Sequence, residues 1–305
     1  MYAVTQDYID AIMSPVQAGE IVGTINGSIN FTSEDVLLGS ASISNQCADS
    51  TDVKVGSVYV GTLQITFCNK NILPRGSWEG SVIRIYWQQH LFNEYGYSVE
   101  EVPCGVYVVS EANHSAEGVV VTAFDYMSKL DKRVNFSALT PGTIYNYLRV
   151  IANRCSITLG QSEEDIEDLP NTSETLTLYQ DSDIETYRDL LSWLAQMVGG
   201  FATFNRAGEL VLRQWGVTPV VTFSARERFA GCYFSDFETF YSGVSFVDLN
   251  TQTVRVYSRS GGGLVMSLGA NPFLQNQLEP YQRYLCNNIL NAFDDLHAVP
   301  FCASA

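Results

Sequence analysis

The side chains of this chain whose spacing suits chemistry are two carboxylates, Asp236 and Glu238. Residues at i and i+2 lie on the same side of a β-strand, and glycoside hydrolysis uses two carboxyl groups that flank the bond to be broken. The aromatic neighbours that could stack on sugar rings are Tyr233, Phe234, Phe237, Phe240 and Tyr241. Carboxylates interleaved with aromatic residues are also normal where a strand edge meets a subunit interface. The pair supports a hydrolase only as an alternative, because spacing alone does not establish the carboxyl separation that catalysis requires.

Other catalytic and metal-binding patterns are absent from the sequence. The histidines His90, His114 and His297 stand far apart, and none has the spacing of a zinc site. Residues 258–263, SRSGGG, lack the Lys-Ser/Thr of a phosphate-binding loop and are interpreted as a hairpin turn. The carboxylates of an acidic segment lack the order of a calcium loop and favour a solvated loop; they are Glu163, Glu164, Asp165, Glu167 and Asp168. We therefore expect no catalytic, cofactor-binding or metal-binding residue.

The seven cysteines are an odd number without C-x-x-C spacing, which indicates reduced thiols. Cys68, Cys104 and Cys232 lie in strand-like apolar runs, whereas Cys155 and Cys286 lie in helical ones. We expect them to act as small buried hydrophobic residues, since free cysteine is among the most buried residue types. The remaining two are Cys47 and Cys302.

The length and the net charge of the chain limit the functions that it can have. A chain of 305 residues is long enough for two or three domains. Its formal net charge of -16 argues against a protein that binds nucleic acid or anionic lipid through general electrostatic attraction. An acidic surface would, however, suit a wall past which DNA slides. The first residues lack a basic segment followed by an apolar run, and no window is apolar enough to span a bilayer. We expect neither export by a cleaved signal nor membrane insertion.

The residues that could do chemistry must be positioned by two strand-rich regions with helices between and after them. A short helix ending at Ser14-Pro15 precedes β-branched and aromatic runs that continue to Asp125. Thr140-Pro141 predicts the start of a helix whose apolar face is Ile144, Tyr147, Leu148, Ile151 and Cys155. Strand signals return after Gly216. A final helix is expected at about 277–293. Its apolar face, which is expected to point toward the core, is Leu278, Tyr281, Leu285, Ile289 and Phe293.

The clearest local pattern is a helix and hairpin at residues 182–215. Ser182 and Glu185 have the spacing of a capping box. The apolar face of the helix is predicted to be Ile184, Tyr187, Leu191, Leu194 and Val198, and Gly199-Gly200 ends it. Two alternating strands then flank the turn Asn205-Arg206-Ala207-Gly208.

This module resembles the minor structural proteins that form the tail hub of long-tailed bacteriophages and prophages. The shared order is a helix, paired glycines, a strand, an N-R-x-G turn and a strand ending in R-Q-W. Three further segments are similar to the same family: residues 35–44 with Gly56, residues 105–130 with T-A-x-D-x-M-x-K-L, and residues 264–273 followed by 281–301. The resemblance spans nearly the whole chain, but its motifs describe a scaffold and carry no chemistry.

The resemblance implies a homotrimer at the distal end of the tail, in the virion tail tip or baseplate, assembled in the host cytoplasm. Each subunit would contribute two similar barrels, so that three chains offer near-sixfold contacts to the tail tube and threefold contacts to a spike or fibre. The implied partners are the distal tail or tail tube protein, the spike or fibre protein and the tape-measure protein, with DNA only in passage. In the family further strands complete the second barrel, so we expect that barrel to be incomplete here or covered by another chain.

Together these patterns predict an α+β, predominantly β protein: two barrel-like β domains that flank a helix-plus-hairpin module. The expected divisions are a first barrel-like domain at 1–131, a central α/β module at 132–215, and a second, possibly incomplete barrel with a terminal helix at 216–305. The function expected is a structural, non-enzymatic tail hub. The alternatives are a receptor- or polysaccharide-binding tail module and a tail-associated cell-wall hydrolase using Asp236 and Glu238.

Overall fold

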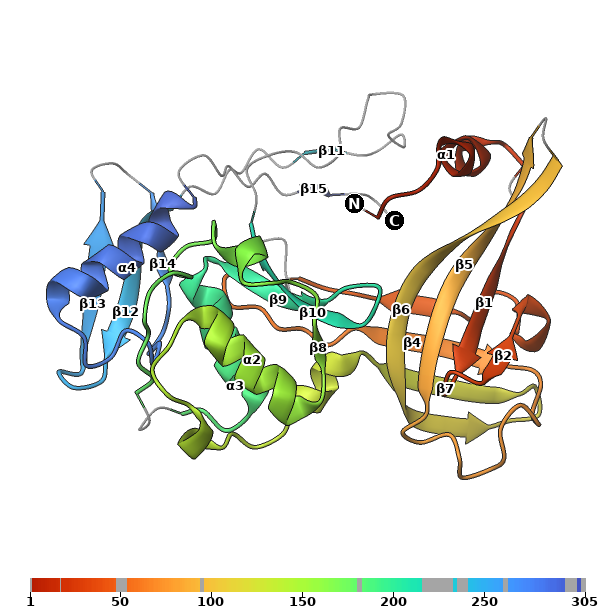
Figure 1. Cartoon of the computed structure of the whole chain (residues 1–305), viewed down its shortest axis with the longest axis horizontal. Coiled ribbons are helices and arrows are strands. Elements are labelled where there is room, and N and C mark those ends of the chain that lie inside the picture. Colours follow the sequence, from red (N-terminus) through yellow and green to blue (C-terminus); the bar gives the residue numbers. More distant parts are fainter. Residues whose placement is uncertain are drawn as a thin grey trace. The chain divides into compact units, whose positions relative to one another are not determined.

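The computed structural model describes residues 2–16, 18–47, 54–93, 96–179, 183–215, 233–234, 241–259, 263–293 and 301–302. The protein is α+β and predominantly β, with four α-helices and four sheets in those residues (Figure 1). The chain forms two compact units. Unit 1 contains Met1–Asn45, Val60–Ser128 and Phe204–Glu209, and unit 2 contains Gln46–Tyr59, Lys129–Thr203 and Leu210–Ala305. The three-domain division at 131 and 215 stays a prediction.

Unit 1 is built on one antiparallel seven-stranded sheet with the order β2-β1-β5-β6-β7-β4-β3. The strands are β1 (Gly19–Ile25), β2 (Ile29–Phe31), β3 (Ser42–Ser44), β4 (Thr62–Phe67), β5 (Val82–Asn93), β6 (Gly96–His114) and β7 (Val119–Phe124). The outer strands of this sheet are β2 and β3, which do not pair with each other. None of the sheets in the described residues closes into a barrel, so the two-barrel arrangement stays a prediction.

The core of unit 1 follows from alternation along the strands. In β4 every second residue is buried, namely Leu63, Ile65 and Phe67, and the intervening side chains turn away from the core. The Phe67 ring packs edge-on against Phe31 at 5.1 Å and lies 5.3 Å from Trp78, between ring centroids. Burial of each such side chain contributes about 1.5–3 kcal/mol to folding. The core therefore fixes which face of the sheet points inward.

The short N-terminal helix α1 (Gln6–Met13) ends at Ser14, where the sequence predicts its end. The Thr5 side chain accepts a hydrogen bond from the Tyr8 amide and so caps the first turn. The helix lies against β5 near the end of the long β5–β6 hairpin (Figure 1). Its residues Ile9 and Met13 remain exposed.

Two helices of unit 2 bury the faces that their periodicity predicts but begin later than predicted. In α2 (Ile144–Cys155) the cap is Thr143, not Thr140, because Gly142 exchanges backbone hydrogen bonds with Leu176 and so holds the chain extended. In α3 (Tyr187–Met197) the capping box is Thr186 with Asp189, since backbone pairing of Arg133 with Thr186 keeps residue 186 extended. Ser182, the predicted cap, lies outside the described residues.

The predicted hairpin after α3 is confirmed. The strands β9 (Gly200–Phe204) and β10 (Glu209–Gln214) form a three-stranded sheet with β8 (Thr158–Leu159) in the order β8-β10-β9. Gly199 has a φ of 66°, as the end of the helix requires, and Gly208 has a φ of 80° in the turn. The Phe201 and Trp215 rings pack at 4.9 Å between centroids, and both are half-buried.

A second three-stranded sheet of unit 2 has the order β13-β12-β14 and packs against α4 (Glu279–Asn291) (Figure 1). Its strands are β12 (Tyr241–Asp248), β13 (Thr253–Ser258) and β14 (Leu264–Ser267). The prediction of a hairpin turn at 258–263 is wrong, because β14 pairs in parallel with β12 and not with β13. Leu278, predicted to turn inward, is an exposed N-cap; Leu285, Ile289 and Phe293 are buried as predicted. The remaining two-stranded pair joins β11 (Tyr233–Phe234) to β15 (Phe301–Cys302).

Buried side-chain amides connect the segments of unit 2. Asn171 donates to the carbonyls of Met197 at 2.8 Å and Leu285 at 3.2 Å, and accepts from the Asn288 amide at 2.9 Å. Other buried amides bond to backbone groups in the same way: Asn271, Gln275 and Gln282. The Met197 carbonyl is at the end of α3, where a carbonyl has no partner within its helix, so the Asn171 amide satisfies a group that would otherwise be buried without one. The Leu285 carbonyl lies inside α4, so the bond from Asn171 adds a second contact there.

Candidate assembly surfaces

Three exposed valines of unit 2 lie on one face of the β13-β12-β14 sheet. Val254 is 64% exposed, Val256 52% and Val265 45%. The register places Val247 opposite Val254, Ser245 opposite Val256 and Gly243 opposite Val265, and residues directly opposite one another point to the same side. This valine face, defined by Val254, Val256 and Val265, therefore has Gly243, Ser245 and Val247 in its central strand and exposed valines on the strands at either side.

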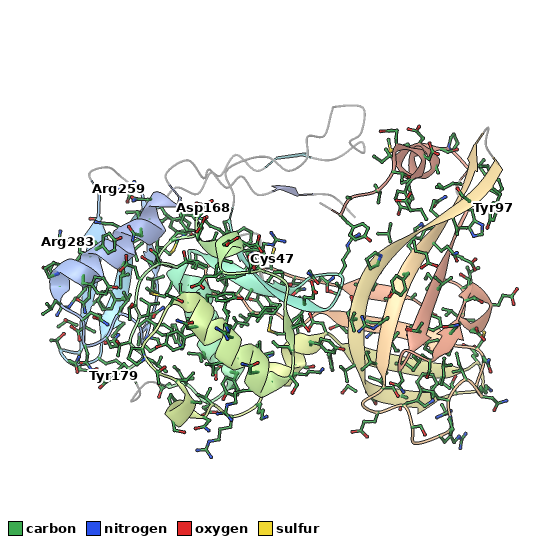
Figure 2. All side chains as sticks on the ribbon, in the orientation of Figure 1. Cys47, Tyr97, Asp168, Tyr179, Arg259 and Arg283 are labelled. Carbon is green, nitrogen blue, oxygen red and sulfur yellow. The ribbon has the colours of Figure 1, made fainter. Side chains whose placement is uncertain are left out.

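The opposite face of the same sheet is packed, which explains why the strands hold their register. Tyr257 and Phe246 are buried there, and the Arg283 guanidinium of α4 lies 5.1 Å from the Tyr257 ring centroid (Figure 2). Arg255 binds the Asp248 carboxylate through Nε at 2.9 Å and Nη2 at 2.7 Å. Desolvation alone would raise the pKa of Asp248, but the Arg255 hydrogen bond and the amides of Asn250 and Thr251 together lower it.

The edges of this sheet are a second assembly feature. Both β13 and β14 pair on one side with β12 and have no strand on the other side in the part of the chain that the structure describes. An edge strand with β-branched residues presents unpaired backbone groups that another strand can extend. Together with the valine face, these edges form a surface suited to contact with another chain.

The outer end of the β5–β6 hairpin in unit 1 carries exposed aromatic rings (Figure 2). Phe92 is 73% and Tyr97 60% exposed, and their ring centroids are 5.4 Å apart. His90 stands beside them, with Nδ1 2.9 Å from the Tyr97 hydroxyl and Nε2 3.3 Å from the Glu20 carboxylate. Both ring nitrogens are thus occupied in holding the hairpin end, and a groove of about 420 Å³ separates it from α1.

The carboxylate with the most altered environment is Asp125, in the T-A-x-D segment of unit 1. Burial raises its pKa to about 6, although the amides of Gly61 and Met127 donate to it at 2.9 and 3.0 Å and lower the pKa in part. A Cβ on Gly61 would lie 2.7 Å from the carboxylate, so only glycine permits this approach. The adjoining cavity of about 30 Å³ has room for about one water molecule, which excludes a substrate site. Asp125 therefore links β4 to the turn after β7.

The sequence singled out neither Asp125 nor the valine face. A carboxylate directly after a strand and before a tight turn was the available signal for Asp125. For the valine face the signal was alternation in T-V-R-V-Y-S, in which both alternating sets contain apolar residues. That pattern does not say which set is covered.

The hydrolase alternative cannot be placed on the structure, because Asp236 and Glu238 lie outside the described residues. His297 also lies outside them. Tyr241, one of the aromatic neighbours, packs edge-on against Phe293 at 5.9 Å and is half-buried. His114 lies at the end of β6, at the turn to β7. In the described part of the chain, no three His, Cys, Asp or Glu side chains are grouped to hold a metal ion.

The cysteines divide by location. Cys155 and Cys286 are buried in α2 and α4, as predicted, and burial raises the pKa of both thiols, that of Cys286 to about 12. Cys68 is exposed, contrary to prediction, because Phe67 faces the core and the next residue points outward. Cys104 is half-buried and Cys47 exposed, while Cys232 lies outside the described residues.

None of the helices in the described residues has the length and apolar character to cross a membrane. No family model matches the sequence, and no curated protein does.

Among solved structures, the chain is similar to the 43 kDa tail protein of prophage MuSo2 from Shewanella oneidensis, with a TM-score of 0.45 and 14% identity over 87% of this chain and 77% of that one. It is similar to a tail protein from Neisseria meningitidis MC58, with a TM-score of 0.45 and 11% identity over 83% and 71%. It is also similar to a chain of the Francisella PdpA-VgrG complex, with a TM-score of 0.43 and 10% identity over 90% and 46%. Similarity at this level does not establish a shared function.

Proposed function

We propose that this chain is a structural tail protein of a bacteriophage that acts as a tail hub. It forms a homotrimeric ring at the tail tip or baseplate and joins the sixfold tail tube to a threefold spike or fibre. It acts by matching symmetries through contacts at strand edges and packed interfaces, and it catalyses no reaction. The tail tube protein, the spike or fibre protein and the tape-measure protein are its partners.

The observation that carries this proposal is the β13-β12-β14 sheet. One of its faces is packed against α4, whereas the valine face and the edges β13 and β14 are exposed. Exposed β-branched strands at an open edge are costly in a protein that works alone, since they invite pairing with other chains. A second copy of this chain is the occupant that the resemblance to trimeric hub proteins indicates.

The net charge supports the same assignment. A formal charge of -16 repels DNA phosphates, so a ring of such chains would let DNA pass without binding it. The valine face contributes apolar area at the contact, which offsets the mutual repulsion of acidic subunits.

Static light scattering tests the proposal. Over loading concentrations from about 1 to 100 µM, the mass is expected to rise to three times the 33.8 kDa of one chain. Replacement of Val256 by Lys places a charge in the contact and is expected to shift the mass toward that of the monomer. Val120→Lys is the matched control, since Val120 is an exposed valine of β7 in unit 1. A monomer at every concentration contradicts the proposal.

A polysaccharide-binding tail module is the second candidate, and the exposed Phe92–Tyr97 pair favours it. Aromatic rings at an exposed hairpin end offer a stacking platform for sugars. Binding to a glycan array that is lost in Phe92→Ala and Tyr97→Ala would support this function. The hydrolase alternative predicts breakdown of purified peptidoglycan that is lost in Asp236→Asn or Glu238→Gln.

A further inference from the structure

Unit 1 of this acidic protein contains a groove whose lining includes a lysine and an arginine but no carboxylate. Lys70, Arg75 and His114 line it, together with Asn71, Leu73, Pro74 and Ser115, and its volume is about 560 Å³. One wall is the loop that connects β4 to β5, and the other is the turn from β6 to β7. We call this the basic groove.

The walls of the basic groove are firmly held. Leu73 and Trp78 are buried and anchor the loop in the core of unit 1, and the Ser77 amide donates to the Pro74 carbonyl at 3.2 Å. The Lys70 ammonium donates to the Ala116 carbonyl at 2.6 Å and so connects one wall to the other. A rigid groove can select a partner by shape as well as by charge.

The cations of the basic groove are not neutralised by this chain's own described acids. Neither Lys70 nor Arg75 forms an ion pair with a described carboxylate; the ion pairs that join two described residues are His90–Glu20, Arg188–Asp131, Arg255–Asp248 and Arg283–Glu279. Cations left unpaired in a concave site of a protein with a charge of -16 favour an anionic partner.

Unit 2 presents a structured acidic segment of the complementary charge. Its carboxylates are Glu163, Glu164, Asp165, Glu167 and Asp168, of which Figure 2 labels the last. Ile166 is buried beneath them, the Asp165 carboxylate accepts from the Ser162 amide at 2.7 Å, and the Thr172 hydroxyl donates to the Glu167 carbonyl at 3.0 Å. These contacts tie down the segment, which we call the acidic knob, and all five of its carboxylates are exposed.

We propose that the basic groove of one copy receives the acidic knob of a second copy. The inference rests on the self-association in the proposed function and names the charged contact within it. Because the two surfaces differ, the contact is heterologous, and such contacts build rings when their rotation closes. Between chains that repel one another overall, a contact of opposite charges selects the orientation in which they meet.

Reversal of charge on each surface, separately and together, tests the inference in the full chain. Lys70→Glu with Arg75→Glu is expected to weaken self-association about tenfold or more, and so is replacement of Glu163, Glu164, Glu167 and Asp168 by Lys. The two sets combined in one chain restore opposite charges and are expected to recover most of the loss, as a coupled pair of surfaces must. Sedimentation equilibrium at low and high salt measures each constant, with salt weakening the native contact.

Matched controls carry the same changes in charge at exposed positions elsewhere. Arg149→Glu with Arg213→Glu matches the groove variant, and Lys at Glu34, Glu79, Glu101 and Glu111 matches the knob variant. Circular dichroism confirms that each variant folds. If the groove variant trimerises as tightly as the native chain, or if the combined variant does not regain self-association, this inference is wrong and the proposed function is unaffected. A native chain that stays monomeric contradicts both. Groove-dependent binding of inorganic phosphate without any change in self-association also overturns the inference.

Discussion

Unit 1 and unit 2 both bury apolar side chains and pair their backbone polar groups, but they do so by different means. In unit 1 long strands pair with neighbours, so alternation alone supplies an apolar core such as that around Leu63 and Phe67. In unit 2 helices pack against shorter strands, and the buried amides of Asn171, Asn271 and Gln275 donate to the backbone carbonyls of Met197, Trp193 and Val247 and so connect separate segments. The comparison teaches that a regular sheet draws most of its core from an alternating pattern of apolar residues, whereas a mixed unit depends more on particular polar side chains.

The largest effect is expected from a core deletion in unit 1. Phe67→Ala removes a ring that contacts Phe31 and Trp78 and is expected to lower the free energy of unfolding by about 3–5 kcal/mol. Urea denaturation gives the size of the loss, and hydrogen exchange should rise first in β4 and β7. Thr66→Ala, one position away and not in the core, is the control. A loss below 1 kcal/mol would mean that the core does not depend on this ring.

A smaller loss is expected from Asn171→Ala in unit 2. The change leaves the buried Met197 carbonyl, at the end of α3, without its donor, at a cost of about 1–3 kcal/mol, and removes a second contact from the Leu285 carbonyl inside α4. Faster hydrogen exchange in α4 would place the damage in unit 2. Asn288→Ala removes only one of the three bonds and should cost less. Equal losses in the two variants would refute the role given to Asn171.

The smallest effects concern pH and have opposite signs in the two units. Because burial raises the pKa of Asp125 to about 6, its protonated form is favoured in the folded state. Its contribution to stability is full below the ordinary pKa near 4 and is lost as the pH rises through about 6, a change on the order of 1–3 kcal/mol. The lowered pKa of Asp248 acts conversely: its contribution is present above the ordinary pKa and is lost as the pH falls through the folded value.

Denaturation of Asp125→Asn and Asp248→Asn from about pH 2 to 8 separates these contributions. The first variant is expected to lose less stability than the native chain as the pH rises from about 4 to 6, and the second to lose less as the pH falls below about 4. Asp125→Asn also loses an acceptor for one of the amides of Gly61 and Met127, so its stability should be lower at pH 4. Curves parallel to that of the native chain would show that neither carboxylate is coupled to folding.

Sequence patterns predicted the buried faces of the helices better than their ends. The periodic residues of α3, such as Tyr187, Leu191 and Leu194, are buried because 3.6-residue spacing places them on one side wherever the helix begins. The start at Tyr187 depends on backbone pairing with residues 132–134, far away in the chain. A local pattern contains no information about such pairing.

The error at residues 258–263 has the same origin. A glycine-rich turn between two strands predicts a hairpin, but β12 lies between β13 and β14 and pairs with both. Likewise Cys68 lies in an apolar run, yet it faces outward because its neighbour Phe67 occupies the core. Only strand order and register decide which side of a run is covered.

By itself, the sequence determined the predominance of strands, the apolar faces of the helices, the turn at Gly208 and the absence of familiar catalytic spacing, because these depend on neighbours within a few residues. Tertiary structure alone decided that Val254 and Val256 face outward, that Asp125 is buried with a raised pKa, and that Lys70 and Arg75 share one groove. Burial and electrostatic environment depend on residues brought together from distant parts of the chain, so no local pattern can specify them.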